Sequence, residues 1–239
     1  MPTVVLLSDG DWVEPTRALL ERDGVAVEVI PLIGFVAGDA AGMMTAAEQL
    51  RRGAFQWLVV TSPRAVHALA AAAGSLTVPE QTRVATVGDA TAEALAQYGV
   101  ATDFVPTEHT ARALVAQWPD DRNRLCVLWP HSEIARSTVR DGMLAIGAAL
   151  TDVIAYRTVP RELTAQQRAT IAAADAVVVS SGSIARSLTE QVPDANLPMV
   201  SFGPITTADA QDAGLRVVAE ARTKHPEAVA AAVNAALLR

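Results

Sequence analysis

Short runs of Val, Ile and Leu alternate with longer Ala-rich stretches along the whole chain of 239 residues. Most apolar runs end in Gly, Ser, Asp or Pro, as the buried strands of a parallel sheet do. The Ala-rich stretches between them have the length of helices. This pattern predicts repeated β-α-β units. Their strands are expected near 3–7, 25–32, 57–60, 83–87, 102–105, 125–129, 149–156, 176–180, 199–202 and 215–219.

The chain also repeats itself. LVVTSPRAVHAL at 58–69 is nearly matched by VVVSSGSIARSL at 177–188, which begins 119 residues later. Two further pairs occur in the same order, namely 17–30 with 140–153 and 84–100 with 199–215. Collinear matches with similar offsets indicate two diverged copies of one unit, at about 1–118 and 124–239. Pro119 and the polar run at 120–124 mark the predicted join.

Composition narrows the class of protein. Hydrophobic residues make up 51% and charged residues 19% of the chain, which is typical of a globular protein. No apolar run has the length of a membrane span, and the first residues resemble a strand more than a signal peptide, so we expect a cytoplasmic protein. The net charge of −7, without a basic stripe, argues against nucleic-acid binding.

Metal and cofactor motifs are not apparent in the sequence. Cys126 is the single cysteine and lies in an apolar run, which favours a buried thiol. The four histidines are far apart and show no ligand spacing, and no Walker loop or Gly-x-Gly-x-x-Gly follows a strand. The sequence therefore offers no sign of a metal site, and a nucleotide-binding enzyme is disfavoured.

Four stretches resemble the uroporphyrinogen-III synthase family in their order and spacing. These are TSPRAVHAL, VGDATAEAL, PHSEIARSTV with the following IGAALTDVIAYRT, and FGPITTADA. The resemblance implies a duplicated fold of two similar α/β domains with parallel sheets, joined by a two-stranded antiparallel ladder and separated by a cleft. Residues 1–34 and 159–239 would form one discontinuous domain and 35–158 the other, with ladder strands near 28–35 and 152–160.

The resemblance also implies a reaction. The family closes the linear tetrapyrrole hydroxymethylbilane to uroporphyrinogen III, inverts the terminal ring and releases water, in the manner of a cyclising hydro-lyase. It implies a small-molecule substrate, a monomer, and no metal or cofactor. Catalysis would then depend mostly on holding the substrate in one geometry.

Strand-to-helix turns are the expected binding positions, because the substrate carries eight carboxylates and helix N-termini attract anions. Ser62 and Pro63 suit the N-cap and N1 positions of a helix, and the second copy has serines at the same place. Helix capping alone also accounts for these residues. The candidates are Ser62, Gly88, Thr91, Ser180, Ser181, Ser183, Gly203, Thr206 and Thr207.

Charged and aromatic candidates complete the expected site. Arg64, one residue into its helix, opposes the helix dipole unless an anion binds there. Arg136, in the expected first turn of a helix, would add a second charge-assisted contact close to His131 and Ser132, which are further binding candidates. His131 is expected in the strand-to-helix turn, where its imidazole could bind an acetate or propionate, or could instead cap the helix or face solvent. A solvated surface position is the alternative for both arginines. Tyr156 matches the family tyrosine that is thought to assist departure of the hydroxyl, although packing in the ladder is a competing role.

Some positions depart from the family pattern. SDGDW ends the first strand where many members have Arg-Pro, SSGS replaces the commoner Ser-Pro, and Ile205 stands where a Thr can occur. An inactive synthase-like sensor of tetrapyrroles or small anions is therefore the alternative function. A two-domain solute-binding module that closes on a small anion is a third possibility.

Overall fold

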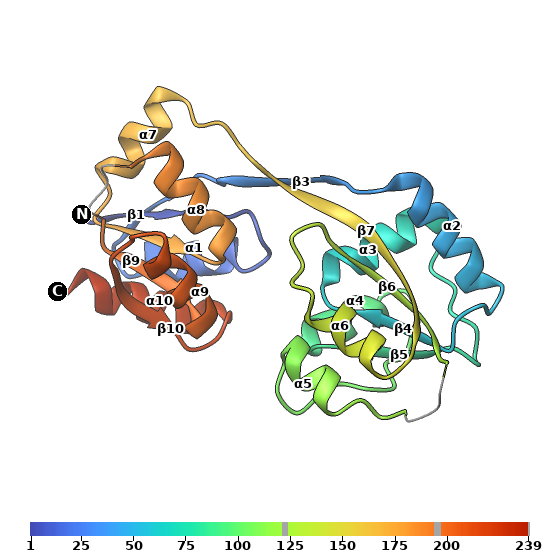
Figure 1. Ribbon diagram of the computed structural model, residues 1–239. Coiled ribbons are helices and arrows are strands. Elements are labelled where there is room, and N and C mark those ends of the chain that lie inside the picture. The colour runs from blue at the N-terminus through green and yellow to red at the C-terminus, as the bar shows by residue number, and fades with distance from the viewer. Residues whose placement is uncertain (121–123, 194–196, 239) are drawn as a thin grey trace. The chain divides into compact units, whose positions relative to one another are not determined.

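The computed structural model describes residues 1–120, 124–193 and 197–238 (Figure 1). The chain divides into two compact units. Unit 1 comprises Met1–Gly34 and Val159–Arg239, and unit 2 comprises Phe35–Thr158. Residues 121–123, in the middle of the predicted join between the copies, lie outside the described residues.

Unit 1 contains a parallel sheet with the strand order β10-β9-β8-β1-β2. Every pairing in it is parallel, as the apolar runs predict. Its central strands, β9, β8 and β1, are buried on both faces, which explains runs such as AVVV without a polar position. The strands are β1 (Thr3–Leu6), β2 (Ala26–Val29), β8 (Ala176–Val179), β9 (Met199–Phe202) and β10 (Val217–Ala221).

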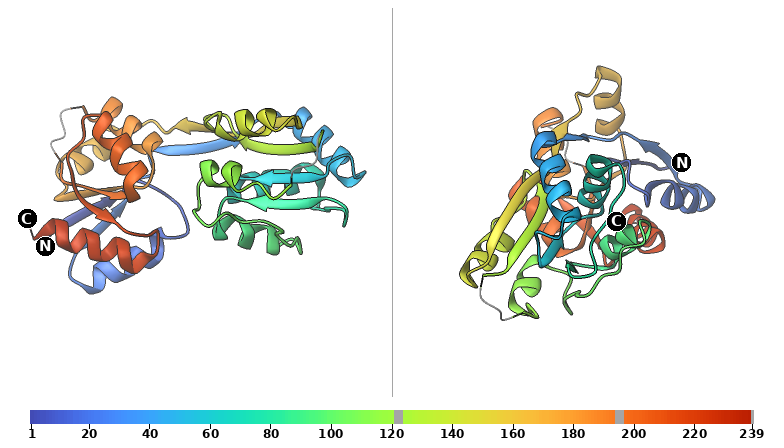
Figure 2. Two further views of the ribbon diagram at one scale, coloured as in Figure 1. Left: turned by 60° about the horizontal axis from the view of Figure 1, so that its bottom comes forward. Right: turned by 90° about the vertical axis from the view of Figure 1, so that its right-hand side faces the viewer.

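Helices cover both faces of this sheet (Figure 2). On one face, α1 and α10 bury a cluster that includes Leu20, Val229 and Val233 against Val4 and Leu6 of β1. On the other face lie α7, α8 and α9. The bounds are α1 (Val13–Arg22), α7 (Ala165–Ala172), α8 (Gly182–Gln191), α9 (Gly203–Asp212) and α10 (Pro226–Leu237).

Unit 2 is built around a second sheet, whose order is β3-β7-β6-β4-β5. The pairings of β4 with β5 and β6, and of β6 with β7, are parallel. The N–H of Gly38 donates to Ala155 and that of Arg161 to Leu32, so β3 runs antiparallel to β7. The strands are β3 (Ile33–Ala37), β4 (Trp57–Val60), β5 (Arg83–Thr86), β6 (Cys126–Ser132) and β7 (Ala149–Pro160).

Side chains of β4 alternate between two cores. Leu58 and Val60 join the core under α2, α3 and α4, whereas Trp57 and Val59 join the core under α5 and α6. The sheet therefore lies between two helical layers. The helices are α2 (Ala40–Arg51), α3 (Pro63–Ala73), α4 (Asp89–Ala96), α5 (Ala111–Ala116) and α6 (Thr138–Ala145).

The two sheets have equivalent strand orders when the copies are aligned. β1 and β2 of the first copy pair with β8 to β10 of the second, and β6 and β7 of the second copy pair with β4 and β5 of the first. At the position of β10, unit 2 has a single parallel bridge between Ala85 and Phe104. Each sheet is thus assembled from both copies.

The strand predicted at 102–105 is wrong, because only that bridge forms there. Asp103 explains the difference. Its carboxylate accepts the N–H of Val84 at 2.7 Å, while the N–H groups of Asp103 and Phe104 both converge on the Val84 carbonyl. A side-chain acceptor therefore takes part of the hydrogen bonding that a ladder would need.

The expected ladder strand near 28–35 begins five residues later and ends two residues later, as β3 at Ile33–Ala37. Pro31 separates β2 from β3, since proline supplies no N–H to a ladder. Within the described residues, no helix is both long and apolar enough to cross a membrane.

The surface of α2 carries one clear titration effect. Hydrogen bonds from Arg51 and Arg52 lower the pKa of the Glu48 carboxyl from its usual 4.5 to about 2, and the Glu48 carboxylate raises the pKa of Arg51. The three side chains are exposed, so the ion pairs contribute little to stability.

Candidate active site

Tyr156 is turned toward the core by a β-bulge. β6 and β7 pair in register as far as His131 with Ile154, after which Ser132 pairs with Tyr156, so Ala155 is the extra residue. Val153 and Ala155 already face the core under α2 and α3. Simple alternation would send Tyr156 to the opposite face, but the bulge places its ring against the same core.

The phenol of Tyr156 meets the N-terminus of α3. Its hydroxyl donates to Oγ of Ser62 at 3.3 Å, and Ser62 Oγ also accepts the N–H of Ala65 as the helix N-cap. The Tyr156 ring packs edge-on against Phe35 with the centroids 5.8 Å apart. The sequence prediction of Ser62 as N-cap and Pro63 as N1 is confirmed.

Arg64 lies beside this tyrosine. Its guanidinium carbon is 3.4 Å from the centroid of the Phe35 ring, a cation–π contact that holds the side chain near Tyr156. Among the ion pairs formed within the described parts of the chain, none involves Arg64. The positive charge is exposed at a helix N-terminus, where an anion would bind favourably.

A hollow of about 520 Å³ extends from Tyr156 and Arg64 between α2 and α3. Apart from Arg64, His67 and the phenol of Tyr156, its lining consists of apolar side chains and backbone. Such a surface suits a flat apolar ring that carries anionic substituents. The lining residues are Phe35, Val36, Ala37, Gly38, Ala40, Met43, Met44, Arg64, His67, Ala68, Ala71, Ala72, Ala155 and Tyr156.

The next strand-to-helix turn in unit 2 holds Gly88 and Thr91. Gly88 is the N-cap of α4, with the ring of His109 packed against it. Thr91 is only 3% exposed, so its side chain offers no ligand surface in this conformation. At this turn a ligand could therefore contact the backbone at Gly88 but not the Thr91 hydroxyl.

His131 does not occupy a strand-to-helix turn, because β6 continues through Ser132. The His131 ring is 6% exposed and stacks on Trp129. Its Nδ1 lies 2.8 Å from the Ser132 carbonyl, to which it donates, while Nε2 lies 3.4 Å from the Asp152 carboxylate without the alignment of a hydrogen bond. Since Asp152 also binds Arg140, the histidine is enclosed within unit 2.

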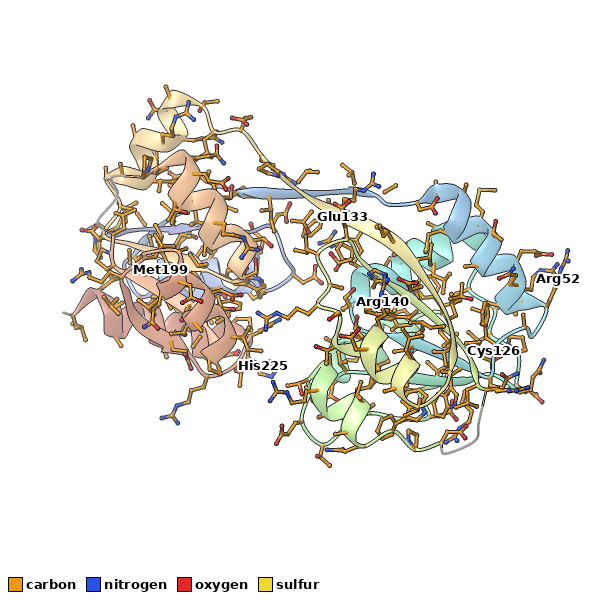
Figure 3. The ribbon with its side chains drawn as sticks, viewed as in Figure 1. Arg52, Cys126, Glu133, Arg140, Met199 and His225 are labelled. Carbon is orange, nitrogen blue, oxygen red and sulfur yellow. The ribbon has the colours of Figure 1, made fainter. Side chains whose placement is uncertain are left out.

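The prediction that Arg136 lies in the first turn of a helix is also wrong. α6 begins at Thr138, after an N-cap at Ser137. Ser132 causes the delay, since its carbonyl accepts the N–H of Ala135 and its Oγ that of Ile134, which makes a turn. Figure 3 shows Glu133 beyond the end of β6 and Cys126 at its start, which locates this turn at the carboxyl end of the strand.

The corresponding turn of unit 1 repeats the α3 arrangement. Ser181 is the N-cap of α8 and accepts the N–H of Ile184 at 3.4 Å, with nearly the same extended backbone as Ser62. Ser180 precedes it at the end of β8, and Ser183 is the second helical residue. All three serines are partly exposed.

The side chains at the start of α9 are less accessible to a ligand than the sequence suggests. Gly203 is the first residue of α9, and Thr206 is 8% exposed. The Thr207 hydroxyl bonds the Gly203 carbonyl, the Ser201 hydroxyl and the Glu220 carboxylate. Hydrogen bonds within unit 1 therefore engage Thr207.

SDGDW lacks the arginine that many family members have after the first strand, but an arginine from another segment of unit 1 lies there. Arg161 donates to the Asp9 carboxylate at 2.8 Å. A guanidinium is therefore present at the end of β1, although an aspartate neutralises it.

The family model described as uroporphyrinogen-III synthase HemD matches residues 14–231, nearly the whole chain. The chain belongs to the uroporphyrinogen-III synthase family. Two curated members show how far it has diverged. It is 31% identical to the uroporphyrinogen-III synthase of Synechococcus elongatus over 151 residues, 60% of this chain and 56% of that protein.

The second relative is the chloroplastic uroporphyrinogen-III synthase of Oryza sativa subsp. japonica. It is 27% identical over 231 residues, which cover 91% of this chain and 74% of the rice protein. The chain thus spans little more than half the length of the cyanobacterial relative and about three quarters of the plant one.

Solved structures of the family have the same fold. A mutant uroporphyrinogen III synthase from the extremely thermophilic bacterium Thermus thermophilus superposes with a TM-score of 0.73 at 14% identity, covering 100% of this chain and 99% of that chain. The enzyme from Helicobacter pylori gives 0.69 at 15% identity, with full coverage of both chains. The predicted class, two α/β sheets dominated by parallel strands, is confirmed.

Within unit 2 the structure brings Ser62, Arg64 and Tyr156 together. Sequence reasoning missed Phe35, which contacts both Arg64 and Tyr156, and His67, on the wall of the same hollow. Helical periodicity contained a signal for His67, because it follows Arg64 by three residues on the same face of α3. No comparable signal marked Phe35.

Proposed function

We propose that this chain is a uroporphyrinogen-III synthase, which cyclises hydroxymethylbilane to uroporphyrinogen III with inversion of the terminal ring and loss of water. The observation that carries the proposal is the position of the Tyr156 phenol. It lies at the N-terminus of α3, on the wall of an apolar hollow and beside Arg64, which forms no ion pair with the residues that the structure describes. Family membership and the names of the relatives agree with it.

Tyr156 would donate its phenolic proton, or a hydrogen bond, to the departing hydroxyl of the substrate. The pyrrole electrons expel that hydroxyl, so a weak acid at the correct position is sufficient. Ser62 Oγ is the present acceptor of the phenol proton and fixes the direction of the hydroxyl. When the leaving group binds, it would replace Ser62 as the acceptor.

Arg64 and the N–H groups at the start of α3 would bind one substrate carboxylate. The apolar hollow would accept the pyrrole face that carries it. By holding the ring in this way, the protein would favour closure at one carbon over the other. The Ser180–Ser183 turn, Gly203 and Arg136 remain predicted contacts.

Five further expectations from the sequence belong to this proposal. We propose a hydro-lyase that works without a cofactor, as a monomer, in the cytoplasm. We also propose that units 1 and 2 are its two functional domains.

The decisive experiment supplies freshly generated hydroxymethylbilane, oxidises the products and separates the porphyrin isomers. Uncatalysed closure gives isomer I. We expect isomer III to increase in proportion to the protein added. If folded protein yields isomer I alone, the enzymatic proposal is wrong and the tetrapyrrole-sensor alternative takes its place.

A further inference from the structure

One peptide group connects the end of β6 to the backbone of Tyr156. It joins Ser132 to Glu133, and it follows the point where the register of β6 and β7 shifts by one residue. Its N–H group donates to the Tyr156 carbonyl at 3.0 Å. Because a peptide group is planar, the direction of this N–H depends on what holds the Ser132 carbonyl on the other side of the same group.

The imidazole of His131 holds that carbonyl. Its Nδ1 lies 2.8 Å from the Ser132 oxygen, and Nδ1 carries the proton because a carbonyl oxygen can only accept. The N–H of Ala135 donates to the same oxygen at 2.9 Å. Both lone pairs of the Ser132 carbonyl are therefore occupied, one by a side chain and one by the turn after β6, so this oxygen does not extend the ladder to β7.

The orientation of the His131 ring is itself fixed by its neighbours. One face stacks on Trp129 with the centroids 4.1 Å apart, and Nε2 lies 3.4 Å from the carboxylate of Asp152, which also binds Arg140. The ring is 6% exposed and has little room to rotate. Moving the imidazole away from Ser132 would therefore disturb its contacts with β6 and β7.

We propose that His131 is a positioning residue for Tyr156. Its imidazole fixes the Ser132–Glu133 peptide group, which holds the backbone of Tyr156 at the bulge that turns the phenol toward Ser62. His131 acts through the backbone and does not touch the substrate. The effect on the reaction rests on the synthase function proposed above. A displaced phenol would slow the chemical step, while Arg64 and the start of α3 would still bind the substrate.

Three substitutions separate the hydrogen-bond donor from the ring. His131→Phe keeps a ring against Trp129 but has no donor. His131→Asn has an amide nitrogen as many bonds from the backbone as Nδ1, whereas His131→Gln has it one bond further away, as Nε2 is. We expect kcat for isomer III formation to fall about ten-fold in His131→Phe and His131→Gln, with KM little changed. His131→Asn should recover most of the loss.

Three results would overturn the proposal. If His131→Phe keeps the wild-type kcat, or loses no more than His131→Asn, the donor to Ser132 has no role in catalysis. If His131→Gln recovers kcat and His131→Asn does not, the contact with Asp152 is responsible instead. A rise in KM at constant kcat in all three variants would mean that His131 binds the substrate.

Thr82→Val is the matched control for stability. The Thr82 hydroxyl is also buried in unit 2 and donates to the Phe55 carbonyl at 2.7 Å, but it lies just before β5, at the opposite end of the sheet from Tyr156. Both His131→Phe and Thr82→Val should lower the thermal midpoint by a few degrees, and only His131→Phe should lower kcat. An equal fall in kcat would show that general loss of stability is the cause, and the proposal would fail.

A readout without turnover separates this proposal from the synthase function. The chain has two tyrosines, Tyr98 and Tyr156, so isotope labelling of tyrosine rings gives two sets of NMR signals. In His131→Phe the Tyr156 signals should shift while those of Tyr98 stay in place, and His131→Asn should restore them. If these shifts occur but the wild type makes no isomer III, the synthase function fails and the positioning role stands. Unshifted Tyr156 signals would refute the positioning role.

Discussion

At the scale of single residues, the site depends on how Tyr156 is aimed. Its position in the sequence suggested a role, but alternation along β7 would have placed the ring on the wrong face of the sheet. One extra residue, Ala155, corrects this. Sequence patterns do not reveal such a bulge, because neither Ala155 nor its neighbours have unusual chemistry.

Replacing Tyr156 with Phe tests the chemistry directly. The ring packing against Phe35 would remain while the proton donor is lost, so kcat should fall by at most about 100-fold, the low end for a positioned proton donor. KM should change little. The measurement is the initial rate of isomer III formation.

Tyr98→Phe is the matched control, because it removes the hydroxyl of the chain's other tyrosine. Equal rates for wild type and Tyr156→Phe would assign the phenol a packing role alone.

Sequence reasoning predicted the helix N-caps at Ser62 and Ser181 correctly, but it placed His131 and Arg136 in the wrong local structure. N-capping is local chemistry, written in a few adjacent residues. The environment of His131 depends on Trp129, Asp152 and Arg140. Asp152 and Arg140 lie on other elements, so no local pattern could have shown that this imidazole is enclosed.

At the scale of elements, the sequence predicted the strands made of apolar runs close to the bounds that they have in the structure. β4 and β9 begin and end where predicted, since both of their faces are buried. β3 was displaced because its apolar residues continue the run that begins in β2, and Pro31 separates the two strands. Its place is fixed by contacts with β7 rather than by its own sequence.

Gly38 shows how close that contact is. A Cβ at this position would lie 2.7 Å from the backbone carbonyl carbon of Ile154, and the N–H groups of Gly38 and Asp39 hold the two strands together. Gly38→Ala should therefore destabilise the protein by about 1–3 kcal/mol, as overpacking does, and displace the segment that carries Tyr156. Urea unfolding measures the first effect and kcat the second.

Gly34→Ala is the matched control in β3, the strand that ends just before Gly38. The nearest atoms there belong to the flexible side chains of Arg161 and Val159, which can move aside. We expect a change within about 1 kcal/mol of zero. A similar loss in both variants would mean that strand propensity, rather than contact with Ile154, governs the effect.

At the scale of the whole molecule, unit 2 is one continuous segment, and unit 1 is made from two. A Cβ on Gly34 would lie 3.7 Å from a methyl group of Val159, so the chain leaves and re-enters unit 1 at neighbouring points. Removing residues 35–158 and joining the ends with a short Gly-Ser linker should give a folded unit 1. Residues 35–158 alone should give a folded unit 2.

Tryptophan fluorescence can follow each unit separately. Trp12 lies in unit 1 against Phe202, whereas Trp57, Trp118 and Trp129 lie in unit 2. We expect a single cooperative transition for each isolated unit. An isolated unit 1 that unfolds without a cooperative transition would show that the units are not independent domains.

The assembly of each sheet from both copies has a consequence for the origin of the chain. A polypeptide that contained one copy alone would have two groups of strands that cannot complete a sheet by themselves. Two such polypeptides could pair all of their strands if each contributed one group of strands to each sheet, as the subunits of a domain-swapped homodimer do. The present chain is then a gene fusion of an entangled dimer, in which symmetry between the subunits is no longer required. Equivalent positions of the two copies, such as Pro63 at the start of α3 and Gly182 at the start of α8, could diverge only after that symmetry was lost.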